Sequence, residues 1–170
     1  MRKFVLQLSV LFLFVTLFSV ASPASAGWHD LTQAQRNQAI VDEANSWSNG
    51  SDGGQCKEWV QSHVVWDASE QAVWLPTNDD YCSWNYHPYV VGMSTIIDWV
   101  NPGEIIQMKL SSTYGGGPHT LIVTANDGED EVTVKESNWC ANDCEEVGSR
   151  TLTYQQFYDM VDCYSVYYIL

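Results

Sequence analysis

The stretch "GPHTLIVTANDGEDEVTVKESNW" (residues 117–139) decides the fold, because it has the pattern of two β-strands joined by a tight turn. Apolar and polar residues alternate on both sides of "NDGE", and Asp-Gly is a strong hairpin signal. We take Asp127 and Gly128 as the two central turn residues. The pairs on one face are then Leu121–Val134, Val123–Val132 and His119–Glu136. That face is apolar except at its open end and the other face is mostly polar, which predicts an antiparallel sheet with one face against a core.

Helices are predicted before this hairpin, and further strands around it. The segment "LTQAQRNQAIVDEANSW" has apolar residues at helical spacing and begins with a capping box of Thr32 and Gln35. A second helix starts near Gln55, after the turn-prone "NGSDGG". Further strands are indicated by "EIIQMKL" and "YSVYYIL", and a short helix by "TYQQFYDMV". This order predicts an α+β fold in which N-terminal helices pack on an antiparallel β-sheet.

The first 26 residues have the organisation of a secretory signal peptide. A basic "MRKF" precedes an apolar stretch, and "ASPASA" places Ala24 and Ala26 at the small-residue positions of a cleavage site. The apolar stretch is short for a membrane span, although a permanent N-terminal anchor is the alternative. We therefore expect a secreted protein, extracellular or periplasmic. Its mature chain (residues 27–170) would be a single domain with no membrane association after cleavage.

The chain is strongly acidic. Seven Lys and Arg against 21 Asp and Glu give a formal net charge of −14 at pH 7, and loss of Arg2 and Lys3 with the signal would make it −16. Such a charge repels phosphate backbones, so nucleic acid is not expected as a partner. Its simplest role is to keep a secreted monomer soluble. Eight Trp and nine Tyr are available for a core and for a groove that binds sugars or peptides.

Five cysteines in an exported chain leave one cysteine without a partner. The oxidising context favours disulfides, and the unpaired thiol is a candidate reactive group. We favour Cys140–Cys144, which closes the short loop "CANDC", and Cys82–Cys163, although other pairings are possible. A zinc site is the rival for these residues, but its spacing matches no standard zinc finger. Its ligands would be Cys82, His87, Cys140 and Cys144.

The position of Cys56 suits a nucleophile, although half of a disulfide and a buried core thiol are the alternatives. It lies at the predicted start of the second helix, where unpaired N–H groups and the helix dipole favour the thiolate. Gly53 and Gly54 allow a tight turn and a close approach of substrate. Backbone N–H groups near Gly54 and Gln55 would bind substrate or stabilise an oxyanion.

His119 is the best candidate base for this thiol. It shares the apolar face of the hairpin with Glu136, which the assumed turn places opposite it, and with Asn138 two residues further on. His63 would lie about 10 Å from Cys56 along the same helix, which is beyond hydrogen-bond reach. A histidine with a purely structural role is the alternative for His119.

The order of these residues resembles that of papain-like enzymes, in which a cysteine at a helix start is followed by a histidine and a polar residue on successive strands. The details resemble CHAP domains, the cysteine- and histidine-dependent amidohydrolases/peptidases, over roughly residues 33–170. The segments that carry this resemblance are "GGQCKEWV", "PGEIIQM", "GGPHTLIV" and "VKESNW". NlpC-type cell-wall peptidases share the layout but fit these details less well. Pro118 stands where CHAP domains usually have glycine.

The resemblance implies a papain-like fold and a Cys-His-Glu triad. Cys56 would be the nucleophile, His119 the general base and acid, and Glu136 the residue that orients the imidazole. Asn138 would be a second orienting residue or a substrate contact. The usual substrate of the family is peptidoglycan, which is cut at an amide bond.

Two other functions are compatible with the same residues. One is a secreted, disulfide-stapled binding module without catalysis, against which the intact Cys56, His119 and Glu136 argue. The other is a different acyl transfer at the same thiol, such as transpeptidation or deamidation of a protein. No cofactor is expected. No obligatory metal is expected either, because the oxygen ligands near the thiol form a poor calcium set: Asn49, Ser51, Asp52 and Glu58.

Overall fold

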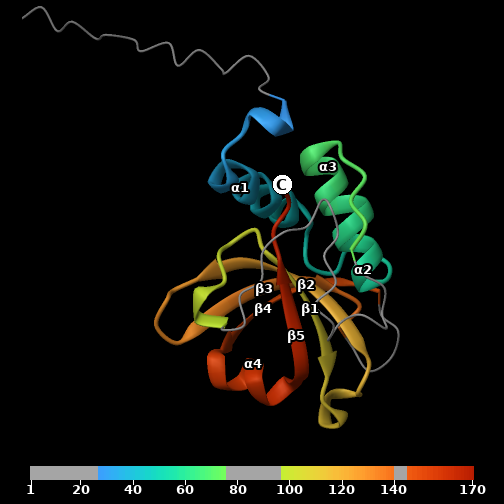
Figure 1. Ribbon diagram of the computed structural model, residues 1–170. Helices are drawn as coiled ribbons and strands as arrows, with labels where there is room; N and C mark the ends of the chain where they lie inside the picture. The colour runs from blue at the N-terminus through green and yellow to red at the C-terminus, as the bar shows by residue number, and fades with distance from the viewer. Residues whose placement is uncertain (1–26, 76–96, 140–144) are drawn as a thin grey trace, which may run out of the picture.

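The computed structural model describes residues 27–75, 97–139 and 145–170, which form three layers (Figure 1). A five-stranded sheet lies in the middle, with the N-terminal helices against one face and a short C-terminal helix against the other. The predicted α+β class is confirmed. The predicted signal peptide lies outside the described residues. Within the described ranges, no helix combines the length and apolar character needed to cross a membrane.

Two helices begin with capping boxes, the first of them the predicted box of Thr32 and Gln35. In α1 (Gln33–Ser46), Gln35 N–H donates to Thr32 Oγ1 at 3.3 Å and Thr32 N–H donates to Gln35 Oε1 at 2.9 Å. Thr153 and Gln156 form the same reciprocal pair at the start of α4 (Tyr154–Met160). Each box satisfies N–H groups that the first helical turn leaves without partners.

The second predicted helix is present and unbroken, but its middle part is π-helical. It consists of α2 (Cys56–Glu58), the π-helical η2 (Trp59–Val65) and α3 (Trp66–Ser69). Its buried side is packed against α1 and the sheet by Trp59, Val60, Val64 and Val65. Nothing in the apolar spacing predicts the wide turn, which in proteins often accompanies a functional site.

The strands form one antiparallel sheet in the order β4-β3-β2-β1-β5. Their bounds are β1 (Ile105–Leu110), β2 (Pro118–Asn126), β3 (Glu131–Ser137), β4 (Val147–Thr153) and β5 (Val161–Tyr167). Strand β4 is absent from the sequence-based expectation. It lies at the edge of the sheet, where Val147 is its one buried residue, so its sequence has no marked apolar alternation.

The predicted register of the β2–β3 hairpin is wrong by two residues from Leu121 to Val123 and by three nearer the turn, because a β-bulge lies between Val123 and Ala125. Leu121 pairs with Glu136, and Val123 pairs with Val134, because residues 127–130 form a four-residue loop in place of a two-residue turn. The Asp127 carboxylate stabilises this loop by accepting three backbone N–H groups at 2.9–3.0 Å, those of Glu129, Asp130 and Glu131. On the His119 side of the bulge the shift is even, so the side chains there keep their predicted face. His119 and Glu136 therefore still share a face, as diagonal neighbours.

Both faces of the sheet are buried, so the expectation of a single core-facing side is wrong. On the helical side, Ile105, Ile122 and Tyr167 pack against α1 and η2. On the other side, Leu121, Val134 and further apolar residues pack against α4 and against η4 (Ile97–Trp99). The helices thus bury the polar strand residues that alternation alone would expose.

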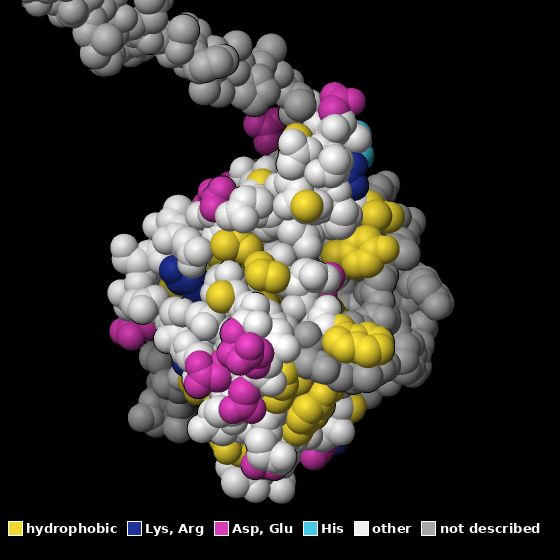
Figure 2. Space-filling model, turned by 90° about the vertical axis from the view of Figure 1, so that its left-hand side faces the viewer, with side chains coloured by type: hydrophobic (Ala, Val, Ile, Leu, Met, Phe, Trp, Pro, Cys, Tyr) yellow, Lys and Arg dark blue, Asp and Glu magenta, His cyan; other side chains and the backbone are white. Residues whose placement is uncertain are grey.

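Acidic side chains outnumber basic ones on the side of the molecule shown in Figure 2. This distribution agrees with the formal net charge of −14. Apolar side chains are interspersed among them, as is usual for a folded surface. The acidity is therefore a surface property, which favours solubility.

Candidate active site

Cys56 begins α2 and is the free cysteine of the described residues. Cys56 is therefore not half of a disulfide. Only 9% of its surface is exposed. The first N–H groups of a helix have no partners within the helix, so the thiol lies where backbone donors are available to an anion.

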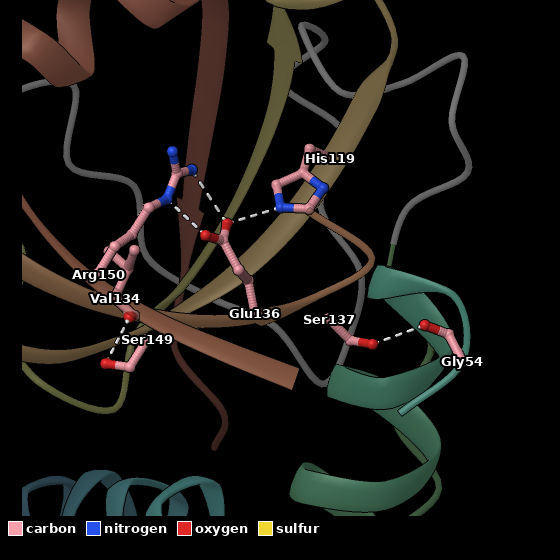
Figure 3. Close-up of polar contacts among 7 residues, drawn as sticks. All are labelled: Gly54, His119, Val134, Glu136, Ser137, Ser149 and Arg150. Carbon is pink, nitrogen blue, oxygen red and sulfur yellow. Dashed lines mark hydrogen bonds and ion pairs between the residues drawn. The ribbon is translucent and has the colours of Figure 1, made fainter. Parts of the chain in front are cut away.

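The turn before Cys56 is fixed against the end of β3. Ser137 Oγ donates to the Gly54 carbonyl at 2.7 Å (Figure 3), and Gly53 N–H donates to the Glu145 carbonyl at 2.8 Å. A Cβ atom on Gly53 would lie 2.7 Å from Ser137 Oγ, so only glycine fits at this position. Gly54 has a φ of +65°, a left-handed conformation that glycine adopts without strain. These contacts set the position at which the helix begins.

The His119 imidazole, on β2, is hydrogen-bonded to the Cys56 thiol. Burial raises the pKa of Cys56, but the hydrogen bond and charge of His119 more than offset this effect. The backbone N–H groups of Thr120 and Lys57 add to the offset, so the pKa of the thiol is lowered from its ordinary value. The environment therefore favours the thiolate, which is the nucleophilic form.

Glu136 holds the other side of the same imidazole. Its Oε2 lies 2.7 Å from His119 Nε2 (Figure 3), which leaves Nδ1 for the thiol. Burial lowers the pKa of His119, but the interactions with Cys56 and Glu136 raise it to about 9. The two side chains are only 4% and 2% exposed. The imidazolium therefore stabilises the thiolate on one side and the carboxylate on the other, and is stabilised by both, in a site with little water.

Arg150, on β4, belongs to the site and is not predicted from the sequence. Its Nη2 donates to Glu136 Oε2 at 3.1 Å, and its Nε lies 2.5 Å from Glu136 Oε1 (Figure 3). The guanidinium stacks on Trp139, with Cζ 3.5 Å from the ring centroid. Trp139 in turn meets the His119 ring edge to face, at a centroid distance of 5.0 Å. The Glu136 carboxylate is thus held between two cationic groups that share one aromatic neighbour.

Asn138 and Gln55 form a polar chain beside the thiol. Asn138 Nδ2 donates to Gln55 Oε1 at 2.9 Å, and Gln55 Nε2 donates to Glu145 Oε1 at 3.0 Å. Asn138 has a positive φ of 59°, so its backbone turns away from the strand directly after β3. This arrangement favours a contact to substrate or to Gln55 over direct orientation of the imidazole.

Cys56 lies at the junction of two hollows in the surface. The first has a volume of about 560 Å³, and its lining includes Thr113, Tyr114, Asn138 and Trp139. The second has a volume of about 490 Å³, and its outer part is lined by Glu58, Gln61, Ser62 and Trp74. Cys56, Gln55 and Pro118 line both hollows. A ligand lying in this cleft would therefore pass directly over the thiol.

The other residues considered from the sequence are only partly within the described chain. His63 packs against the Trp47 ring at a centroid distance of 5.3 Å, consistent with a core or groove-lining role. Cys163 is disulfide-bonded. Cys82, Cys140 and Cys144 lie outside the described residues, so their pairing and the rival zinc site stay predictions. Within the described ranges, no three His, Cys, Asp or Glu side chains are grouped to hold a metal ion.

No family model matches the chain, and no curated protein matches it in sequence. Solved structures are similar in fold, among them two of the protein Ly7917. The crystal structure of Ly7917 aligns with a TM-score of 0.50 and 17% identity, over 80% of this chain and 62% of that chain. The crystal structure of Ly7917 with the hydrolyzing product of MDP aligns with a TM-score of 0.56 and 17% identity, over 78% and 63%. The chain thus spans less than two thirds of Ly7917, and the likeness extends to the α+β fold alone.

Proposed function

We propose that this protein is a secreted cysteine amidohydrolase or peptidase of the CHAP type, with a papain-like fold, that cleaves amide bonds of peptidoglycan. One observation carries the proposal. An unpaired thiol with a lowered pKa is hydrogen-bonded to an imidazole, and a buried carboxylate holds that imidazole from its other side. Perturbed titratable groups that converge in an open cleft are characteristic of catalytic sites. A purely structural cysteine has no need of either partner.

The proposed reaction uses these groups in two steps. The Cys56 thiolate attacks the amide carbonyl, and backbone N–H groups at the start of α2 stabilise the oxyanion. The His119 imidazolium donates its proton to the departing amine, which leaves a thioester on Cys56. His119 then takes a proton from water as the water attacks the thioester, and the carboxylic acid departs. Glu136 keeps the imidazole in the required tautomer and stabilises its protonated form.

The substrate class rests on the resemblance to CHAP domains and on the structural neighbour. Ly7917 has been crystallised with the hydrolyzing product of MDP, a peptidoglycan-derived compound. The cleft across Cys56 is open on two sides of the thiol, which suits a chain-like substrate that extends past the scissile bond. Transfer of this substrate class to the present chain is part of the proposal.

Mass spectrometry of purified peptidoglycan tests the proposal, after digestion by the wild type, by Cys56→Ala and by a matched His63→Gln control. We expect new amine and carboxyl ends at one type of amide bond with the wild type and the control, and none with Cys56→Ala. An added amine that appears in the product would identify acyl transfer in place of hydrolysis. A polymer left intact by the wild type would overturn the substrate assignment.

A further inference from the structure

We propose that the cleft continues past the thiol to a saccharide-binding subsite on Trp66 and Trp74. The placement of the scissile amide next to this subsite rests on the proposed function, but the binding of a sugar does not. Trp66 and Trp74 are 47% and 64% exposed, respectively. Large exposed apolar side chains that border a cleft are characteristic of ligand sites.

The surface is continuous from Cys56 to the two indoles. The hollow of about 490 Å³ that contains Cys56 is also lined by Gln61, Ser62 and Trp74. A neighbouring hollow of about 300 Å³ is lined by the same three residues together with Trp66, Ala72 and Val73. The two hollows therefore form one groove, with the thiol at one end and Trp66 at the other.

The helix that begins at Cys56 forms one side of this groove. Glu58 and Ser62 are exposed and line the hollow that contains Cys56, and Ser62 and the exposed Trp66 line the neighbouring hollow, so the three side chains follow the groove. Cys56 and Trp66 are ten residues apart, which is more than two helical turns even with the wide π-helical turn between them. The groove is therefore longer than a single small ring and suits an oligomeric ligand.

Trp74 is held outward by the packing of its neighbours. Val73 and Leu75 are each only 3% exposed, and successive side chains of an extended segment point to opposite sides. Leu75 N–H donates to Gln61 Oε1 at 3.0 Å, which fastens the segment to the helix. The indole is thus presented on a fixed backbone, so a ligand that stacks on it would not have to order that backbone.

The chemistry of the lining favours a neutral sugar over a charged peptide. None of the described residues that line the hollow of about 300 Å³ is charged. The indole faces offer flat apolar surfaces for the C–H faces of sugar rings. The Gln61 amide and the Ser62 hydroxyl offer hydrogen bonds to ring hydroxyl and acetamido groups. The other arm of the cleft, beyond Tyr114 and Trp139, would then receive the peptide side of the substrate.

Calorimetric titration of a tetramer of N-acetylglucosamine into Cys56→Ala tests the subsite without any turnover. We expect measurable binding that weakens at least tenfold when Trp74→Ala is added, and less when Trp74→Phe is added. Trp99→Ala is the matched control, because Trp99 is 69% exposed and belongs to η4 on the opposite face of the sheet. Absence of binding, or equal weakening by Trp99→Ala and Trp74→Ala, would overturn the proposal.

Kinetics on a matched pair of substrates link the subsite to the reaction. With Cys56 intact, Trp74→Ala should lower kcat/KM at least tenfold more on a sugar-bearing peptide than on the same peptide without sugar. An equal loss on both substrates would contradict a saccharide subsite. If the wild type cleaves neither substrate, the proposed hydrolase function fails, while the titration still decides whether the groove binds sugar.

Discussion

Lys135 and Glu136 are consecutive residues of β3, both are buried, and they lie on opposite faces of the sheet. The Lys135 ammonium donates to the Trp47 carbonyl at the C-terminal end of α1, and burial lowers its pKa. The Glu136 carboxylate is held by Arg150 and His119. The Lys135 ammonium thus joins α1 to the sheet, whereas the Glu136 carboxylate favours the protonated form of His119, which lies beside the Cys56 thiol. A buried charge therefore indicates function only when its partner can itself take part in chemistry.

Among the variants that test the different roles of Lys135 and Glu136, Glu136→Gln is expected to have the largest effect on activity. The amide keeps the shape of the side chain but cannot stabilise the imidazolium or select its tautomer, so we expect kcat/KM to fall by about 10⁴-fold. Steady-state kinetics on a peptide amide measure the loss. A decrease of less than about threefold would remove Glu136 from the mechanism.

Arg150→Met is expected to lower kcat by about 10- to 100-fold, because the carboxylate that orients His119 loses its second anchor. With the guanidinium gone, more of the carboxylate charge acts on the imidazolium, so the pKa of His119 rises beyond about 9. The imidazolium is needed to protonate the leaving amine, so the alkaline limb of the pH profile should move to higher pH.

Arg150→Lys is the matched control, because it keeps the positive charge beside Glu136. Its alkaline limb should stay near that of the wild type even where kcat is lower. Identical limbs for Arg150→Met and Arg150→Lys would show that Arg150 supports only the packing of β4.

Lys135→Met is expected to leave kcat/KM within about twofold of the wild type, the smallest effect on activity. It leaves the partly buried Trp47 carbonyl without its Lys135 donor, so the free energy of unfolding should fall by about 1–3 kcal/mol. Denaturant unfolding measures this change, and the activity assay is the control. A large loss of activity in a variant that is still folded would mean that both charges on β3 belong to the catalytic machinery.

The faces of the hairpin could be predicted from the sequence, but its register could not. Alternation fixes which side of the sheet His119 and Glu136 occupy, and a two-residue slip does not change it. The number of loop residues depends on the Asp127 side chain and its three N–H contacts, which the Asp-Gly pattern does not specify. The pairing was therefore wrong, although the predicted contact between His119 and Glu136 is present.

Arg150 and the π-helical turn η2 could not have been found from the local pattern. Arg150 lies on an edge strand whose residues are mostly half-exposed, so the alternation that identified the other strands is weak there. The π-helical turn has buried apolar residues like those of an ordinary buried helix, so the apolar pattern does not distinguish the two. The position of Cys56 at a helix start was predictable because the glycines before it and the apolar spacing after it are both local signals.

The reactivity of Cys56 toward iodoacetamide as a function of pH tests the central claim most directly. Because the pKa of Cys56 is lowered, the wild-type thiol should react at about pH 6 faster than an ordinary free thiol. In His119→Ala the burial remains while the hydrogen bond and charge of the imidazole are lost, so the inflection should move to higher pH. A wild-type Cys56 that reacts no faster than a free thiol, or a profile that His119→Ala leaves unchanged, would contradict the account.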